Sequence, residues 1–231
     1  MARDELRCDT CAVRDQAACA VLSRDERAEL AALGRRRLLR RGETLFAAGD
    51  DNAVSATLTK GVLKVSCCDA DGTEHIVALI HPAGFAGELF APTAQHDFVA
   101  LSDCELCVFP RGQFEQALQR FPQLGSAMLR RSALELAESR QRLAGVTNRN
   151  ATQRVAGLLM TLAQAANSRE CHAAREFDLG MTRGEIASLL GLTIETVSRQ
   201  LTRMERDGII RRKGARGIEM IDTARLGTLA T

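Results

Sequence analysis

Residues 181–208 have the pattern of two short helices joined by a tight turn, and this pattern constrains the fold most strongly. Thr182 and Glu185 have the spacing of a capping box, and Gly191 is placed to end the first helix. Thr193 can cap the second helix. The spacing therefore predicts a helix-turn-helix unit, which is typical of proteins that read duplex DNA.

The second helix of this unit has one apolar and one polar face. Apolar residues recur at steps of three and four and are expected to be buried together: Ile194, Val197, Leu201 and Met204. Glu195, Ser198 and Arg199 then lie within one turn on the exposed side. A carboxylate accepts a hydrogen bond from cytosine and an arginine donates two to guanine. We therefore expect these three side chains to read bases.

A basic segment follows the second helix. Residues 209–221 alternate around glycines as a small β-hairpin would. From Arg199 to Arg216 seven Arg or Lys residues stand against two acidic residues, an excess that suits phosphate. A solvated charged surface is the alternative interpretation. The predicted phosphate contacts are Thr182, Arg183, Thr193, Thr196, Arg203, Arg211, Arg212 and Lys213.

Composition limits the class of protein. A chain of 231 residues is long enough for two domains, and 45% hydrophobic residues indicate a globular protein. Because aromatic residues make up only 3%, with no Trp or Tyr, few side chains can stack on unpaired bases, which favours duplex DNA. The N-terminus is charged and no apolar run reaches about 18 residues. A cytoplasmic protein with no membrane partner is expected.

Eight cysteines in such a chain indicate metal ligands or redox groups rather than disulfides. Three of them form the pattern Cys-x2-Cys-x7-Cys: Cys8, Cys11 and Cys19. An iron–sulfur cluster and zinc both fit such thiolates, and either normally needs a fourth ligand. Cysteines present by chance are the alternative. The candidates for the fourth ligand are Cys67, Cys68, Cys104, Cys107 and Cys171.

The first half of the chain predicts strands joined by turns. After a brief helical pattern at Ser23–Leu33, glycines separate short apolar runs. The clearest unit is a β-hairpin with strands Leu63–Cys67 and Glu74–Leu79. A further helix is expected over residues 151–168, before the helix-turn-helix unit.

Strand parity separates the candidate ligands, because adjacent strand residues point to opposite faces. Cys67 and Cys68 therefore cannot both bind one metal ion. Around residue 106 the same parity places Cys104 in the core with its apolar neighbours and leaves Cys107 outside. Cys107 is the predicted fourth ligand.

After Pro110 the pattern becomes helical over a long stretch. An approximate seven-residue repeat along residues 121–148 predicts a seam through which two copies pair. The seam residues are Leu129, Ala133, Leu136, Arg140 and Leu143. A homodimer would place two recognition helices about one turn of DNA apart, so the expected site is an inverted repeat. A helix packed within a monomer is the alternative.

The order of these parts resembles the Crp/Fnr superfamily of bacterial transcription regulators, and Fnr-type oxygen sensors of alphaproteobacteria in particular. The motifs are Gly42–Asp50, Lys60–Lys64 and, most specific, Leu192–Arg199. The resemblance implies an α+β protein in four parts. These are a cysteine-rich cluster-binding segment (1–22), a β-roll sensor domain similar to the cyclic-nucleotide-binding jelly roll (23–120), a dimerisation helix (121–148) and a winged helix-turn-helix domain (149–231).

The resemblance also implies roles for residues. In Fnr-type regulators the Glu, Ser and Arg of the last motif read bases, which matches Glu195, Ser198 and Arg199. Three N-terminal cysteines and one from the β-roll, shortly before a proline, hold an oxygen-labile [4Fe–4S] cluster. The matching set is Cys8, Cys11, Cys19 and Cys107. The implied function is an oxygen-responsive regulator that is not an enzyme. It would bind a palindromic DNA site as a dimer while the cluster is intact, and act with RNA polymerase.

A cyclic nucleotide is not an expected ligand. Gly87–Leu89 resembles part of a phosphate-binding cassette, but residues 92–101 lack the Arg-Ser pair that cAMP-binding relatives need. Two other functions stay open. One is a regulator of the same type with zinc or a thiol redox switch at the cysteines. The other is a thiol oxidoreductase that uses Cys8 and Cys11, although no thioredoxin-like pattern accompanies them.

Overall fold

The computed structural model describes residues 5–166, 175–214 and 216–231, without the side chains of residues 142, 143, 145–147 and 165. The chain forms two compact units, Met1–Glu138 and Ser139–Thr231. The long helix α3 (Pro122–Asn148) begins in the first unit and ends in the second, and its bounds agree with the predicted dimerisation helix. Among the described helices, none is both long and apolar enough to cross a membrane.

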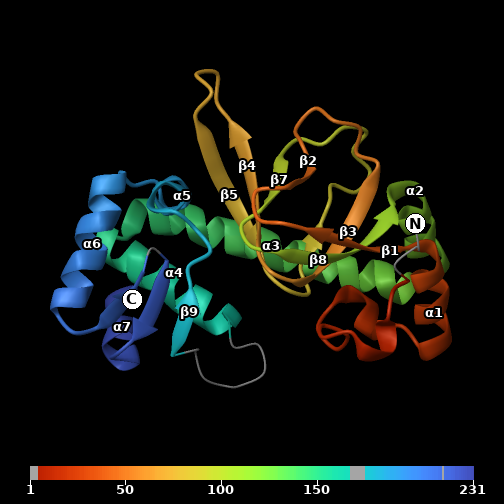
Figure 1. Ribbon diagram of the computed structural model, residues 1–231. Helices are drawn as coiled ribbons and strands as arrows, with labels where there is room; N and C mark the ends of the chain where they lie inside the picture. Colours follow the sequence, from red (N-terminus) through yellow and green to blue (C-terminus); the bar gives the residue numbers. More distant parts are fainter. Residues whose placement is uncertain (1–4, 167–174, 215) are drawn as a thin grey trace. The chain divides into compact units, whose positions relative to one another are not determined.

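Two four-stranded antiparallel sheets form the first unit, as the predicted β-roll requires (Figure 1). One sheet has the order β1-β8-β3-β6 and the other β2-β7-β4-β5. Side chains from both sheets form the core, including the fully buried Leu58, Leu63 and Leu106. The strands are β1 (Arg35–Leu39), β2 (Thr44–Phe46), β3 (Val54–Lys60), β4 (Leu63–Cys68), β5 (Glu74–Ile80), β6 (Phe85–Ala86), β7 (Asp97–Ala100) and β8 (Cys104–Pro110). Because β4 and β5 pair antiparallel, the predicted hairpin is confirmed.

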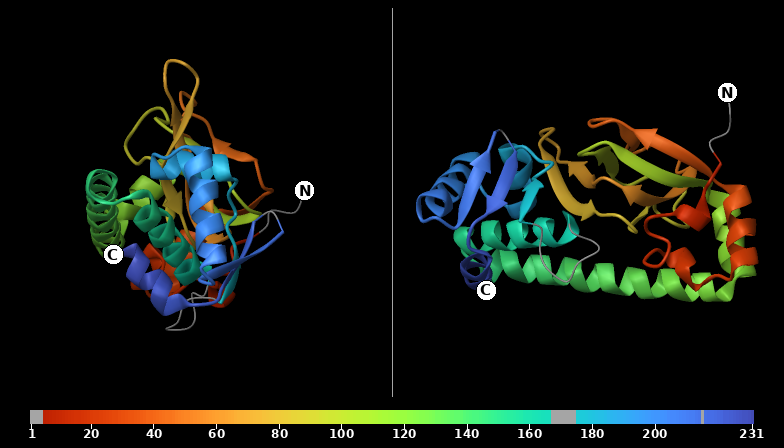
Figure 2. Two further views of the ribbon diagram at one scale, coloured as in Figure 1. Left: turned by 90° about the vertical axis from the view of Figure 1, so that its left-hand side faces the viewer. Right: turned by 60° about the horizontal axis from the view of Figure 1, so that its bottom comes forward.

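Helices gather at one end of the β-roll (Figure 2). Two short turns, η1 (Cys8–Thr10) and η2 (Ala18–Val21), precede α1 (Arg24–Leu33). α2 (Arg111–Arg120) is a separate helix before α3, whereas only one long helical stretch is predicted after Pro110. An apolar cluster joins these elements to the outer face of β8: Leu22, Leu30, Phe109, Phe114, Ala117, Phe121, Leu124 and Met128. The N-terminal segment is thereby held against the strand that carries Cys107.

The second unit contains the predicted helix-turn-helix and wing. Its elements are α4 (Ala151–Ala166), β9 (Glu176–Asp178), α5 (Arg183–Leu190), α6 (Ile194–Arg206), β10 (Ile210–Lys213), β11 (Gly217–Met220) and α7 (Thr223–Ala230). β10 and β11 pair antiparallel, which confirms the predicted hairpin, and β9 adds a third strand. Residues 167 and 168, at the predicted end of α4, lie outside the described residues.

Side-chain caps define the helix-turn-helix as predicted. The Thr182 hydroxyl accepts from the Glu185 N–H at 3.2 Å, and the Thr182 N–H donates to the Glu185 carboxylate at 2.7 Å. Gly191 ends α5 with φ of 60°, a left-handed conformation that costs glycine little. The Thr193 hydroxyl accepts from the Thr196 N–H at 3.2 Å and starts α6. The two helices are therefore fixed by local sequence.

Candidate metal centre and nucleic-acid interface

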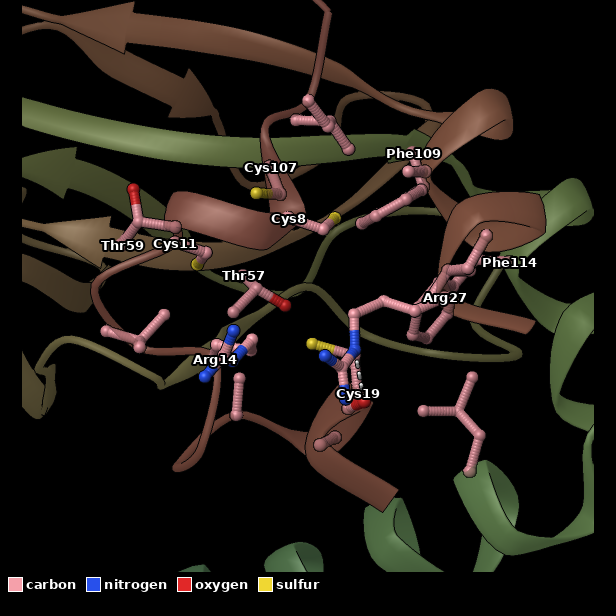
Figure 3. A pocket seen from close by; sticks show the side chains of 17 residues that line it. Cys8, Cys11, Arg14, Cys19, Arg27, Thr57, Thr59, Cys107, Phe109 and Phe114 are labelled. Atoms are coloured by element: carbon pink, nitrogen blue, oxygen red, sulfur yellow. Dashed lines mark hydrogen bonds between the residues drawn. The ribbon is translucent and has the colours of Figure 1, made fainter. Parts of the chain in front are cut away.

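Four cysteines from two distant parts of the chain line one cavity in the first unit (Figure 3). Three come from the N-terminal segment and one from β8: Cys8, Cys11, Cys19 and Cys107. The cavity volume is about 40 Å³, compared with about 10–15 Å³ for one water molecule. The structure thus brings together all four residues predicted as ligands.

Strand β8 orients Cys107 as parity predicts. Cys104 is buried in the core between the sheets, where its thiol donates to the carbonyl oxygens of Val62 and Ser102. Cys107 lies on the opposite face, half-buried, and its ladder neighbour on β3 is Thr57. The predicted inward direction of Cys104 and outward direction of Cys107 are both confirmed.

The other described cysteines lie away from this cavity. Cys67 and Cys68 lie on β4 opposite His75 and Glu74 of β5, and neither lines the cavity. Cys171 lies outside the described residues. The seven described cysteines are all free thiols, so the part of the chain that the structure describes contains no disulfide.

The cavity wall is mostly apolar, with a few polar groups. Leu6, Val13, Phe109 and Phe114 contribute apolar surface, while Arg14, Arg27, Thr57 and Thr59 bring polar atoms. Sequence reasoning missed these polar residues. Arg27, Thr57 and Thr59 come from α1 and β3, which meet the cysteine segment only in the folded chain, whereas Arg14 lies within that segment.

Burial makes the thiols hard to ionise. It raises the pKa of Cys107 to about 12, and the three neighbouring cysteines add to this effect. Burial also raises the pKa of Cys8 and Cys19, which the positive charge of Arg27 partly opposes. At neutral pH these three thiols are therefore protonated in the metal-free protein, and a bound metal must displace their protons.

A zinc ion and an iron–sulfur cluster place different demands on four thiols. A zinc ion needs four donors at about 2.0–2.3 Å from one point. Within the described residues, no three His, Cys, Asp or Glu side chains are placed to hold a metal ion. The four thiols instead line a cavity of about 40 Å³ together with thirteen other residues. In an iron–sulfur cluster each thiolate binds a different iron, so the four donors need not converge on one point.

The buried face of α6 departs from the prediction at one residue. Val197, Leu201 and Met204 are buried as expected. Ile194 is 52% exposed, so its predicted burial is wrong. It lies in the first turn of α6 beside Gly184 of α5, which has no side chain to cover it.

The polar face of α6 presents the predicted base-reading residues. Glu195 and Arg199 are exposed and Ser198 is half-buried. The pKa of Glu195 is lowered by hydrogen bonds from the Glu195 backbone N–H and from the Thr193 hydroxyl. The Glu195 carboxylate is therefore ionised and can accept hydrogen bonds. Arg183 of α5 donates to the Ser198 hydroxyl at 3.2 Å. The two helices therefore meet at this polar face.

Three basic residues of the wing are paired with carboxylates. The pairs are Arg211 with Glu219 at 3.0 Å, Arg212 with Glu205 at 2.7 Å and Lys213 with Glu176 at 2.7 Å. Arg212 is half-buried, and both its N–H and its guanidinium donate to Glu205 of α6. It therefore holds the wing against α6, a link that sequence reasoning missed, whereas Arg211 and Lys213 are exposed.

Helix α3 carries an exposed apolar stripe. Leu124 and Met128 are buried against the first unit. The predicted seam residues lie on another face: Leu129 is 73% and Leu136 is 52% exposed, and Ala133 and Arg140 are exposed as well. The side chain of Leu143 lies outside the described residues. In the single chain, the described part of the stripe has no covering surface.

The loop that resembles a phosphate-binding cassette is tied by its own side chains. The Glu88 carboxylate lies 2.6 Å from His96 Nδ1 and accepts from the Gln95 N–H at 2.6 Å. Asn52 donates to the Ala91 carbonyl at 3.0 Å. The carboxylate is thus engaged within the loop.

Both halves of the chain are similar to known protein families. Residues 153–229 match the Crp-like helix-turn-helix domain family, and residues 36–121 match the cyclic nucleotide-binding domain family. The chain is 34% identical to the transcriptional activator protein FnrL of Cereibacter sphaeroides over 223 residues, which cover 95% of this chain and 90% of that protein. It is 31% identical to the nitrogen fixation regulation protein FixK of Bradyrhizobium diazoefficiens over 223 residues, covering 96% and 93%. The structure of FixK2 from Bradyrhizobium japonicum is similar with a TM-score of 0.76 at 25% identity, covering 86% of this chain and 98% of that one.

Proposed function

Because the chain belongs to the Crp/Fnr family of transcription regulators, we propose that it is an oxygen-responsive member whose DNA binding depends on a [4Fe–4S] cluster. Its Crp-like helix-turn-helix domain makes it a DNA-binding protein. Its relatives are transcription regulators, so it is not an enzyme, and a thiol oxidoreductase is excluded.

One observation carries the proposal of a cluster. Of the described cysteines, the four that line the cavity are the four whose spacing and strand parity suggest ligands: Cys8, Cys11, Cys19 and Cys107. Their spread around a shared space supports a cluster over a single zinc ion. When bound, a [4Fe–4S] cluster would supply an oxygen-sensitive link between the N-terminal segment and β8.

The chain's own residues suit such a link. The segment that bears three of the cysteines packs on β8 through Leu22 and Phe109, next to the start of α3. A change in the order of this segment would therefore act on the surface that supports α3. We infer that the four cysteines govern DNA binding through this contact.

The expected result of anaerobic reconstitution is a broad visible absorption with iron and sulfide in equal amounts. Exposure to air should bleach the absorption and weaken binding to duplex DNA. A zinc or thiol-switch regulator would instead take up no sulfide and show no visible cluster absorption. That outcome would refute the cluster and leave the family assignment intact.

We also propose that the protein binds DNA as a homodimer and that its DNA site is an inverted repeat. The exposed stripe on α3 supports pairing of two copies, because a two-fold axis brings the same residues of both helices together. Two copies of α6 would then present Glu195, Ser198 and Arg199 to successive major grooves. RNA polymerase is the partner through which a regulator of this kind acts.

Leu136→Glu should disrupt the homodimer. Leu136 lies on the exposed stripe, and two glutamates facing each other across a two-fold axis would be buried without a partner. We expect the dimer dissociation constant to rise by about 100-fold or more, measured by analytical ultracentrifugation of the cluster-loaded protein. Leu134→Glu is the matched control, because Leu134 is 66% exposed on a different face of α3. Equal effects of the two substitutions would contradict the assigned seam.

A further inference from the structure

Arg27 of α1 is fastened to the turn that carries Cys19. Its Nε donates to the Cys19 carbonyl at 3.3 Å, and its Nη2 donates to the carbonyls of Leu22 at 2.9 Å and Ala20 at 3.4 Å. The turn η2 has no side-chain hydrogen bond at its own N-cap. One guanidinium therefore binds three main-chain oxygens of this turn, in addition to the packing of Leu22 in the apolar cluster.

An arginine is suited to this contact. Its planar guanidinium presents donors in a fixed fork, and hydrogen bonds from a charged donor are stronger than those between neutral groups. Arg27 is half-buried and lines the cavity, and Figure 3 shows its nitrogen atoms beside Cys19. The contact thus lies at the cavity wall.

The helix that carries Arg27 is itself anchored. Ser23 and Glu26 form a capping box at its start, and Leu30 is buried in the apolar cluster. Gln123 of α3 donates to the Glu26 carboxylate at 2.7 Å. Because α1 is fixed at its first turn and through its apolar face, Arg27 can transfer that order to the Cys19 turn.

We propose that Arg27 is a positioning residue that holds the Cys19 turn at the cavity, so that its thiol is directed into the space shared with Cys107. The anchoring of the turn is a property of the protein without metal. Its consequence for a cluster rests on the function proposed above. Cys19 is the ligand furthest along the N-terminal segment, and this contact ties it to α1.

Three full-length variants test the proposal. Arg27→Met removes all donors, Arg27→Lys keeps the charge but loses the fork, and Arg24→Met is a matched control at an exposed position of the same helix. In the metal-free protein, amide hydrogen exchange over residues 17–23 should be about tenfold faster in both Arg27 variants, the factor expected from losing roughly one hydrogen bond to a charged donor. Arg24→Met should leave it unchanged.

A second measurement concerns the cluster. In anaerobically reconstituted protein, the visible absorption should decay several times faster in air for both Arg27 variants, and at the wild-type rate for Arg24→Met. This readout separates positioning of Cys19 from a general loss of stability, which circular dichroism would detect.

The outcomes distinguish the proposal from the function on which it rests. Unchanged hydrogen exchange in Arg27→Met would overturn the anchoring, and full protection in Arg27→Lys would overturn the role of the fork. Faster exchange with an unchanged decay rate would overturn the positioning of a cluster ligand. If wild-type protein takes up no cluster but Arg27→Met still exchanges faster, the anchoring stands and the cluster function fails.

Discussion

Replacing Cys107 with alanine should abolish uptake of an iron–sulfur cluster, whereas replacing Cys104 should not. The two cysteines lie three residues apart on β8 and face opposite sides of the sheet. Cys107 lines the cavity with the N-terminal cysteines, and Cys104 is buried in the core. Without the Cys107 thiolate, one iron would lose its protein ligand. Anaerobic reconstitution followed by visible absorption and assays of iron and sulfide measures the result.

Cys104→Ala is the matched control, because it removes a thiol from the same strand without touching the cavity. Its thiol makes two weak hydrogen bonds to main-chain oxygens, so we expect a modest loss of stability and normal cluster content. Full cluster content in Cys107→Ala would show that the fourth ligand lies elsewhere. Loss of the cluster in Cys104→Ala but not in Cys107→Ala would reverse the assignment.

Local signals explain why so much of the DNA-binding unit can be predicted from sequence. The bounds of α5 and α6 depend on caps a few residues away, such as Thr182 with Glu185 and Gly191 at a left-handed position. Strand parity is local in the same way, and it places Cys104 and Cys107 correctly. Each of these features depends on backbone geometry over less than about two turns of helix or one strand.

Features that depend on distant partners could not be predicted. Ile194 has the spacing of a buried residue, but it lies beside Gly184 of the neighbouring helix, which has no side chain to cover it, and stays exposed. Arg212 has the appearance of a phosphate ligand, yet Glu205 holds it. A pattern of charges shows how many basic residues a segment has. It does not show which of them are already neutralised by tertiary contacts.

The cavity shows the same division. The spacing of the N-terminal cysteines indicates that they bind one metal group together. The walls of the cavity, however, include residues of β3, β8 and α1. Thr57 and Arg27 reach the cavity only because the segment packs on the outer face of β8. The presence of clustered thiol ligands is therefore a local property of the sequence, while the environment around them is a property of the fold.

Arg199→Ala should remove base discrimination from the DNA-binding unit. Arg199 is exposed on the polar face of α6, and its guanidinium donates a hydrogen bond to the Thr196 hydroxyl at 3.4 Å. That hydrogen bond is long, so a guanine can replace it. Loss of a bidentate contact should cost about 1–3 kcal/mol of preference at one base pair of each half-site, or roughly 5- to 150-fold. Fluorescence anisotropy with duplexes substituted at each position measures it, using cluster-loaded protein without oxygen.

Arg203→Ala provides the contrast, because Arg203 is a predicted phosphate contact one turn further along α6 and pairs only loosely with Asp207, at 3.8 Å. It should weaken binding to all duplexes alike and reduce the slope of affinity against salt by about 1 for each subunit. Arg199→Ala should leave nonspecific, salt-sensitive binding in place. If its base preference is unchanged, or if Arg203→Ala changes preference at a single position, the division of α6 into base-reading and phosphate-binding residues is wrong.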